Sequence, residues 1–346
     1  MVEFKNMFTY LVGAAILITG SYLASQYKNS LESNDEYKLI KKYLLNDSPL
    51  YGYDKPKLWI HTKYEINSRK WKDFYSRNTT DLNQPYIHLT IKTIINHCGS
   101  DFNICLIDDE SFSKLIPNWD VDITSLAEPI KSNFRHLALT ELIYYYGGMI
   151  VPNSFCCTKN LDEFYKEGTL GDRPFFCEAT NHTVNSLNQK RKYLFIPDIN
   201  FMGATKNNKT ILSLVEYLKS ICRDPHFSSE HKFTGNISQW LINANNKYMI
   251  NIVGGEVIGI KTSDRKQILL DNLMEEEYLN FHDSLVGIYI PEDEILKRPK
   301  YQWFAYMTSE EIVKCKMIIS KYLAASLADS LSEYYKSSEI KSVISI

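Results

Sequence analysis

The stretch that decides the fold is residues 128–161, EPIKSNFRHLALTELIYYYGGMIVPNSFCCTKNL. From Ile130 the apolar residues recur at helical spacing and leave little polar face, which predicts a helix buried inside a core. Gly147-Gly148 stands where this helix ends, because glycine tolerates the left-handed backbone conformation. Met149-Ile150-Val151 then predicts a short strand, and Pro152 ends it.

Strand and helix patterns alternate on either side of this stretch. Lys57–Thr62 and Asn103–Ile107 predict buried strands, and Gln84–His97 predicts the helix between them. This order implies a right-handed crossover between parallel strands. Further strands are expected at 175–178, 198–204, 250–260 and 284–290, and further helices at 111–116, 210–222, 237–243 and 308–335. The sequence therefore predicts an α/β fold with a mixed, mainly parallel sheet flanked by helices.

The helix with Arg135, the Tyr146-Gly147-Gly148 stop and the hydrophobic strand resemble the glycosyltransferases with a GT-A fold, which include capsular-polysaccharide synthesis enzymes and Golgi mannosyltransferases. The resemblance covers roughly residues 56–245. In that family an Asp-x-Asp follows the strand and holds a divalent cation, which neutralises the departing diphosphate of a sugar nucleotide. Here the matching residues are Pro152-Asn153-Ser154, so both carboxylate ligands are replaced. The Pro-x-Ser-Phe-x-Cys turn is also similar to glycosyltransferase-like proteins of large DNA viruses.

The resemblance implies which residues border a sugar-nucleotide site, because open α/β sheets bind ligands at the carboxyl ends of their strands. The arginine on the long helix is suited to a phosphate or a sugar hydroxyl. The residues that we expect to bind the sugar nucleotide are His61, Thr62, Asp108, Arg135 and Ser154. The candidates for a catalytic base are Asp198 and Glu178.

Several of these residues have structural alternatives that the sequence leaves open. A histidine at a strand end often serves as a hydrogen-bonding residue of the scaffold. Asp108 or Asp109 is equally suited to cap the helix at 111–116, since aspartate is a strong N-cap residue. Ser132 replaces the acidic residue that the family places three positions before its arginine, so a salt bridge from Arg135 to a loop carboxylate is as good an interpretation as ligand binding.

Composition narrows the class of protein. The chain has 346 residues, is 44% hydrophobic and carries a net charge of -2, so it can bury a large core and has no general attraction to nucleic acid. Seven cysteines form no CxxC pair, and we expect mostly reduced, buried thiols. Sequons, which an asparagine-rich chain also produces by chance, occur at Asn46, Asn78, Asn181, Asn208 and Asn236.

The N-terminal segment predicts a membrane anchor. No residue from Asn6 to Tyr27 is charged, and this length is enough to cross a bilayer. A cleaved signal peptide is the alternative, but Glu3 opposes Lys5 and Tyr22-Leu23-Ala24 is a poor cleavage site. We therefore expect an anchor at 1–28, a stalk at 29–54 and a glycosyltransferase-like domain at 55–346.

Two functions follow from this pattern. The first is that of a membrane-anchored protein with a degenerate metal site that is weakly active or inactive. Such a protein would serve a structural or scaffolding role with protein partners, in a host secretory membrane or a virion membrane. The second is an active transferase that uses a nucleotide sugar without the usual Asp-x-Asp. Manganese or magnesium would be a cofactor only in an active enzyme. The missing carboxylates at 152–154 favour the first hypothesis.

Overall fold

The computed structural model describes residues 55–63, 84–180, 195–223 and 230–328. The chain divides into two units, Met1–Pro49 and Leu50–Ile346, and every described residue belongs to the second. The predicted anchor at 6–27, the predicted stalk and the sequons at Asn46, Asn78 and Asn181 lie outside the described residues. Within the described ranges, no helix has both the length and the apolar composition that a bilayer crossing requires.

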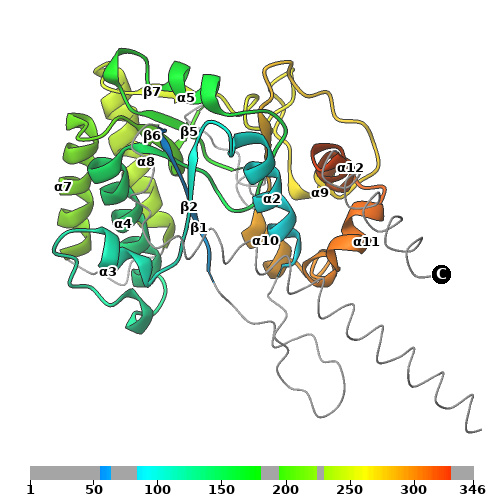
Figure 1. The fold of residues 1–346 in the computed structure, drawn as a ribbon, viewed down its shortest axis with the longest axis horizontal. Helices are drawn as coiled ribbons and strands as arrows, with labels where there is room; N and C mark the ends of the chain where they lie inside the picture. The colour runs from blue at the N-terminus through cyan, green and yellow to red at the C-terminus, as the bar shows by residue number, and fades with distance from the viewer. Residues whose placement is uncertain (1–54, 64–83, 181–194, 224–229, 329–346) are drawn as a thin grey trace, which may run out of the picture. The chain divides into compact units, whose positions relative to one another are not determined.

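A six-stranded mixed sheet with strand order β2-β1-β3-β6-β5-β7 forms the centre of the second unit (Figure 1). The parallel pairs are β1 with β2, β1 with β3, and β5 with β7, whereas β6 runs antiparallel to both β3 and β5. The strands are β1 (Lys57–His61), β2 (Asn103–Ile107), β3 (Gly148–Ile150), β5 (Phe175–Glu178), β6 (Pro197–Ala204) and β7 (Asn251–Val253). The prediction of a mixed, mainly parallel sheet flanked by helices is confirmed.

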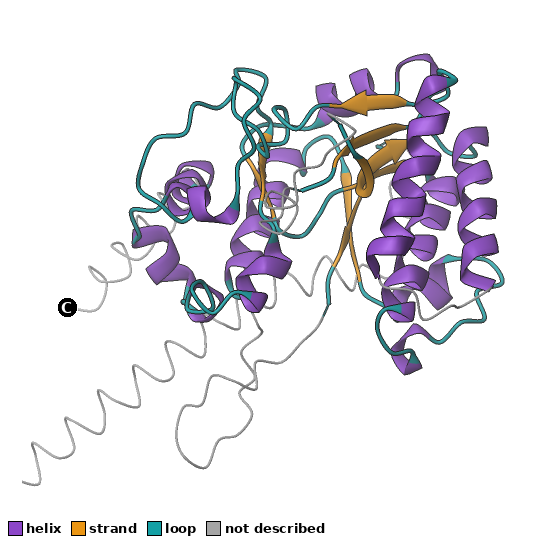
Figure 2. Ribbon diagram, turned by 180° about the vertical axis from the view of Figure 1, so that it is seen from behind, coloured by secondary structure: helices purple, strands orange, loops and turns teal. Residues whose placement is uncertain are grey.

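One helical layer packs on one side of this sheet, as Figures 1 and 2 show. Its helices are α3 (Ser111–Leu115), α4 (Ile130–Tyr146), α7 (Lys209–Arg223) and α8 (Glu230–Asn246). Their apolar side chains form one continuous core with sheet residues such as Trp59, Ile150 and Met202. The long helix predicted from Ile130 is therefore at the centre of this layer, between the sheet and α7.

A second helical group lies on the other side, around a small sheet of two antiparallel strands, β4 (Phe155–Cys157) and β8 (Gly287–Tyr289) (Figure 2). A separate hydrophobic cluster joins this sheet to the helices. The helices of this group are α2 (Tyr86–Cys98), α9 (Leu270–Leu273), α10 (Glu292–Lys297), α11 (Ser309–Lys314) and α12 (Ile318–Ser326). The turn after β3 therefore carries the chain from the large sheet into the small one.

The helix stop before β3 depends on two glycines with positive φ. Gly147 has φ 69° and Gly148 has φ 91°, a region that residues with a Cβ rarely adopt. A Cβ on Gly148 would also collide with the carbonyl oxygen of Lys57 in the neighbouring strand. The indole Nε1 of Trp59 donates to the carbonyl oxygen of Gly147 at 3.0 Å, so β1 holds this turn from the side.

The structure corrects three predicted elements. The single helix predicted at 308–335 is two helices, α11 and α12, because Cys315 to Met317 are not helical, and its last residues lie outside the described range. The helix predicted at 237–243 is longer, because α8 begins at Glu230 and ends at Asn246. Only Asn251–Val253 of the strand predicted at 250–260 is extended. The sequence did not predict the strand β4 or the helices α5 (Asp162–Gly168), α9 and α10.

Candidate functional site

One edge of the large sheet gathers most of the predicted site residues. The parallel strands β1, β2 and β3 end at this edge, and the antiparallel strand β6 begins there beside the carboxyl end of β5. His61, Asp108 and Ser154 follow or end the first three strands, and Glu178 and Asp198 lie on the other two. Strand order therefore produces two groups, one at β1 and β2 and one at β5 and β6, with the 152–154 turn between them.

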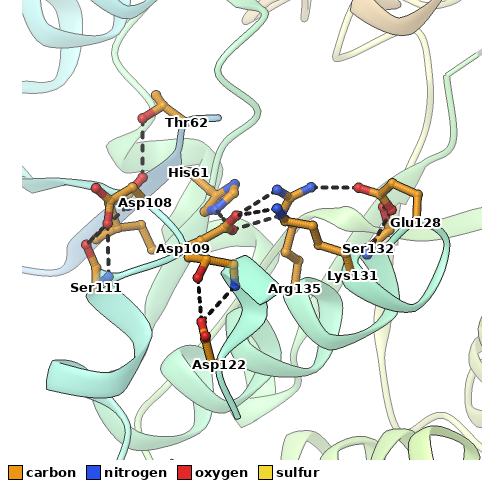
Figure 3. A network of polar contacts seen from close by, with 12 residues as sticks. His61, Thr62, Asp108, Asp109, Ser111, Asp122, Glu128, Lys131, Ser132 and Arg135 are labelled. Atoms are coloured by element: carbon orange, nitrogen blue, oxygen red, sulfur yellow. Dashed lines mark hydrogen bonds and ion pairs between the residues drawn. The ribbon is translucent and has the colours of Figure 1, made fainter. Parts of the chain in front are cut away.

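Asp109 is the centre of the first group (Figure 3). The Arg135 guanidinium binds it with two parallel hydrogen bonds, Nε to Oδ1 at 2.8 Å and Nη2 to Oδ2 at 2.6 Å. The Nε2 atom of His61 lies 3.0 Å from the same Oδ1. Bidentate arginine–carboxylate pairs are among the strongest charge-assisted contacts in proteins, so this pair fixes both side chains.

The protonation states follow from these contacts. Burial of Asp109 opposes its ionisation, but the hydrogen bonds from Arg135 and His61 outweigh that effect and hold its pKa well below the usual range. Burial lowers the pKa of His61, against the opposing effect of the Asp109 carboxylate, so the imidazole is neutral at pH 7. A neutral His61 therefore donates its Nε2 proton to Asp109. Its ring also stacks on Phe112 of α3, with ring centroids 5.4 Å apart.

Arg135 has a second carboxylate partner. Its Nη1 atom donates to Oε1 of Glu128 at 3.1 Å, and Oε2 of Glu128 accepts from the backbone N–H and the hydroxyl of Ser132. Lys131 also approaches Asp109, with Nζ 4.0 Å from Oδ2. Arg135 is 8% exposed, so its guanidinium is held inside the protein between Asp109 and Glu128. The sequence left ligand binding and a structural salt bridge open for Arg135, and the structure contains a salt bridge from Arg135 to a loop carboxylate.

Asp108 and Thr62 make local contacts beside this group. Oδ1 of Asp108 accepts from the backbone N–H of Ser111 at 2.9 Å and from its hydroxyl at 2.6 Å. Asp108 therefore binds the first residue of α3 although the N-cap position belongs to Glu110, a local structural role close to the capping alternative that the sequence left open. Thr62 extends β1 toward β2, since its backbone N–H donates to the carbonyl oxygen of Ile107 at 2.9 Å.

The turn at Pro152-Asn153-Ser154 connects the two sheets and uses its polar groups to do so. The hydroxyl of Ser154 donates to the carbonyl oxygen of Ile290 at 2.9 Å, and Ser154 is 1% exposed. The backbone N–H of Ile290 donates in return to the carbonyl oxygen of Ser154. The carbonyl oxygen of Asn153 accepts from the hydroxyl of Thr90 on α2 at 2.5 Å. These contacts hold the turn to the small sheet and to α2.

Glu178 is the centre of the second group. Its Oε1 atom lies 2.5 Å from Nζ of Lys261, and its Oε2 accepts from the backbone N–H of Gly255 at 3.1 Å. Glu178 is 3% exposed and Lys261 is 9% exposed, so this is a buried ion pair. Burial raises the pKa of Glu178, although the Lys261 ammonium opposes the shift. The pair fastens the segment after β7 to the end of β5.

Asp198 has neutral partners among the described residues. Its Oδ1 accepts from the backbone N–H of Ile199 at 2.7 Å, and its Oδ2 accepts from Nδ2 of Asn200 at 2.6 Å. Burial, together with the nearby Asp198 carboxylate, raises the pKa of Tyr289 in β8 well above its usual value. Asp198 therefore lies near enough to Tyr289 of the small sheet to affect its ionisation.

The residues at this edge do not fit a divalent cation of the kind that the family resemblance implies. Magnesium and manganese sites require anionic oxygens. The Ser154 hydroxyl is buried against a carbonyl, and the Asp109 and Glu178 carboxylates are bound by Arg135 and Lys261. Across the described ranges, no three His, Cys, Asp or Glu side chains come together in a group that could hold a metal ion.

Sequence reasoning missed three partners at this edge. It treated Asp109 only as a cap and did not consider Glu128 or Lys261. Glu128 lies in the turn before α4, seven positions before Arg135, so helical spacing does not predict their contact. Lys261 carries no local signal either, since the sequence separates it from Glu178 and only the sheet brings them together.

No protein-family model and no curated protein matches the chain. Two solved structures to which it is similar are glycosyltransferases. One is the apo form of the glycosyltransferase GlyE of Streptococcus pneumoniae TIGR4, with 12% identity, a TM-score of 0.37, and coverage of 82% of this chain and 64% of that chain. The other is the PaToxG glycosyltransferase, with 14% identity, a TM-score of 0.29, and coverage of 64% and 83%. This chain thus spans less than two thirds of the length of GlyE.

Proposed function

We propose that the protein is a membrane-anchored, GT-A-like glycosyltransferase relative whose metal position has degenerated, and that it serves a structural or scaffolding role with little or no sugar transfer. The anchor is the uncharged segment at 6–27, which would hold the domain at a secretory or virion membrane. The GT-A assignment rests on the Tyr-Gly-Gly motif followed by β3, together with the mixed sheet order around it. Fold alone does not establish activity, so the site decides the proposal.

The observation that carries the proposal is the state of Ser154. It stands where the second aspartate of the resembled motif would be, and its hydroxyl is buried and donates to the carbonyl oxygen of Ile290. The hydroxyl in this position extends the pairing between β4 and β8 and is not presented to a ligand. The turn that holds an ion in the resembled family therefore leads here from β3 into the small sheet of β4 and β8.

The charged groups support the same conclusion. Arg135 and Lys261 are the buried cations of this edge, and each is bound by a carboxylate of the protein. A departing diphosphate would have to displace these carboxylates to reach either cation. Losing a metal that contributes several kcal/mol to the transition state would slow transfer by orders of magnitude, at about 1.4 kcal/mol for each factor of ten.

One observation favours the alternative, an active transferase that needs no Asp-x-Asp. Asp198 is only partly buried, and its partners in the described part of the chain are neutral, so its carboxylate is the best placed to act as a base. This alternative requires a nucleotide sugar to bind and turn over without the ion.

A donor assay with the full chain separates the two functions. The chain is titrated with UDP- and GDP-sugars, with and without manganese, and sugar release and transfer are measured by mass spectrometry. The proposal predicts no turnover for any donor. Turnover that Asp198→Asn abolishes, and that the exposed control Asp293→Asn leaves unchanged, would establish the alternative.

A further inference from the structure

Two cysteines from distant parts of the chain meet where α2 crosses the small sheet. Cys98 is the last residue of α2, and Cys157 is the last residue of β4. Their Sγ atoms lie 3.9 Å apart, although the residues are 59 positions apart in the sequence. Both side chains are fully buried. The two sulfur atoms therefore face each other directly across the contact between the two elements.

Polar contacts on both sides hold the backbone around this pair. The backbone N–H of Cys157 donates to the hydroxyl of Thr93 on α2 at 2.9 Å. The hydroxyl of Ser326 on α12 donates to the carbonyl oxygen of Cys157 at 2.5 Å, and Nε2 of His97 lies 3.0 Å from the same hydroxyl. Three elements thus meet at Cys157, and the approach of the two thiols is a fixed feature of the fold.

The neighbouring cysteine is directed elsewhere. Successive residues of a strand point to opposite faces of the sheet, so Cys156 and Cys157 cannot both face α2. Cys156 packs in the hydrophobic cluster with Ile288 and the helices of the second group. Cys105 contacts the carbonyl oxygen of Asn103 through its sulfur. The geometry therefore selects Cys157 as the partner of Cys98.

We propose that Cys98 and Cys157 form an intramolecular disulfide in an oxidising compartment, which would fasten α2 to β4. The Sγ atoms must move from 3.9 Å to about 2.05 Å, and the proposal assigns this change to rotation of the two side chains and a small shift at the ends of α2 and β4. The remaining five cysteines stay thiols. This modification is independent of the function proposed for the carboxyl edge of the large sheet.

The oxidant is a small-molecule disulfide such as oxidised glutathione. One cysteine thiolate attacks a sulfur of that disulfide, forms a mixed disulfide and releases one glutathione thiolate. The second cysteine thiolate then attacks the protein sulfur of the mixed disulfide, which forms the Sγ–Sγ bond and releases the second glutathione thiolate. The two protons of the cysteines pass to the two glutathione thiolates, and the two-electron oxidation of the protein equals the reduction of glutathione disulfide.

The reaction is slow in the folded protein. Burial raises the pKa of Cys157 well above its usual value, and its hydrogen bond with Cys98 adds to the effect. The nucleophile is the thiolate, so few molecules react at neutral pH until the region opens. The bond is therefore expected to form during folding, or over hours in folded protein at raised pH.

The test uses the purified, reduced full chain in a glutathione buffer poised at about −200 mV, a value typical of the secretory pathway. It is incubated at about pH 8, since thiolate attack needs the higher pH, and samples are unfolded in denaturant and alkylated with N-ethylmaleimide until the number of alkyl groups stops changing. The expected product carries five alkyl groups, and a non-reducing digest yields one cross-linked peptide pair that contains Cys98 and Cys157. The cross-link is lost in Cys98→Ala and Cys157→Ala and persists in the control variants Cys105→Ala and Cys156→Ala.

The number of alkyl groups on the wild-type protein tests the proposal even if a variant fails to fold. Seven alkyl groups at equilibrium would overturn the proposal, because both thiols would then be reduced at a poise that oxidises structural disulfides. If Cys156→Ala or Cys105→Ala abolished the cross-link, the proposal would also be overturned, because the disulfide would then involve a cysteine other than Cys98 and Cys157.

Discussion

Asp109 is the residue on which most of the polar structure at the carboxyl edge depends. It accepts two hydrogen bonds from Arg135 and one from His61, and its carboxylate is 15% exposed. Replacing Asp109 by Asn would exchange the bidentate carboxylate partner of the buried guanidinium for a neutral amide and leave the more exposed Glu128 as its charged contact, which we expect to cost about 2–4 kcal/mol of unfolding free energy. Urea unfolding at pH 7 measures the loss. The control Asp122→Asn, at an exposed position, should lose much less.

The effect of Asp109→Asn should depend on pH. The pKa of Asp109 in the folded protein lies below its unfolded value of about 3.9, so the ionised carboxylate stabilises the fold above that pH. This contribution is lost as the pH falls through the folded pKa. The difference between wild type and variant should therefore be full at pH 7 and shrink below about pH 4. A difference that grows on acidification would mean that Asp109 is not the stabilising anion.

The contribution of Glu178 to stability should change with pH in the opposite direction from that of Asp109. Burial raises the pKa of Glu178, so ionisation of this carboxyl costs stability as the pH rises from its unfolded pKa through the folded one. Lys261→Met removes the cation that offsets this cost. We expect a loss of about 3–5 kcal/mol at pH 8 and roughly half of that at pH 5, where protonation relieves the unpaired carboxylate.

Thermal or urea unfolding at the two pH values measures this difference. The control is Lys166→Met, because Lys166 forms an exposed pair with Asp162 on one helix and should change little at either pH. Equal losses for Lys261→Met at pH 5 and pH 8 would show that its ammonium serves packing and not the charge of Glu178.

At the scale of single elements, the glycine pair between α4 and β3 is the most restricted position. Gly148 has φ 91°, and a Cβ there would collide with the backbone of Lys57 in β1. Gly148→Ala should therefore cost about 3 kcal/mol or more, since backbone strain and a clash between strands add. Gly235 is the matched control because it lies in α8 with no atom near its added Cβ, so Gly235→Ala should be neutral or stabilise by up to about 1 kcal/mol. Similar losses for both variants would contradict this account of the turn.

The elements that the sequence predicted well are those with a local cause. The strand at 103–107 and the strand at 175–178 occur with the predicted bounds, and α4 begins and ends as its apolar spacing and glycine stop indicate. The prediction of one continuous last helix was wrong. The apolar stripe from Ile312 to Leu323 continues through Cys315 to Met317, where the backbone leaves the helical conformation. A stripe shows which side chains are buried and does not show that the helix is continuous.

The site was less predictable than the fold, for a physical reason. Its residues could be assigned to one sheet edge from strand order, and Asp108 could be assigned a local structural role from its position before α3. The ion pairs could not be predicted in this way. Asp109 binds Arg135, which is 26 positions away, and Glu178 binds Lys261, which only the fold brings close. Which carboxylates are free for a ligand depends on these long-range pairs, and a single sequence does not contain them.

In the whole molecule, the buried charges of this sheet edge are paired with each other. Asp109 is bound to Arg135 and Glu178 to Lys261, and the turn after β3 leads from the large sheet into the small one. The two hydrophobic cores lie on either side of this connection. The edge therefore stabilises the arrangement of the two sheets, and this agrees with a structural or scaffolding role.

Manganese binding is the most direct test of whether the carboxylates of this sheet edge are unable to hold an ion. The full chain is titrated with Mn²⁺ in the presence of UDP, and electron paramagnetic resonance reports the free aqueous ion. The account predicts that the signal stays equal to that of Mn²⁺ with UDP alone, for the wild type as for the variant Asp198→Asn. Saturable loss of the signal at one ion per chain, abolished by Asp198→Asn or Glu178→Gln, would contradict it.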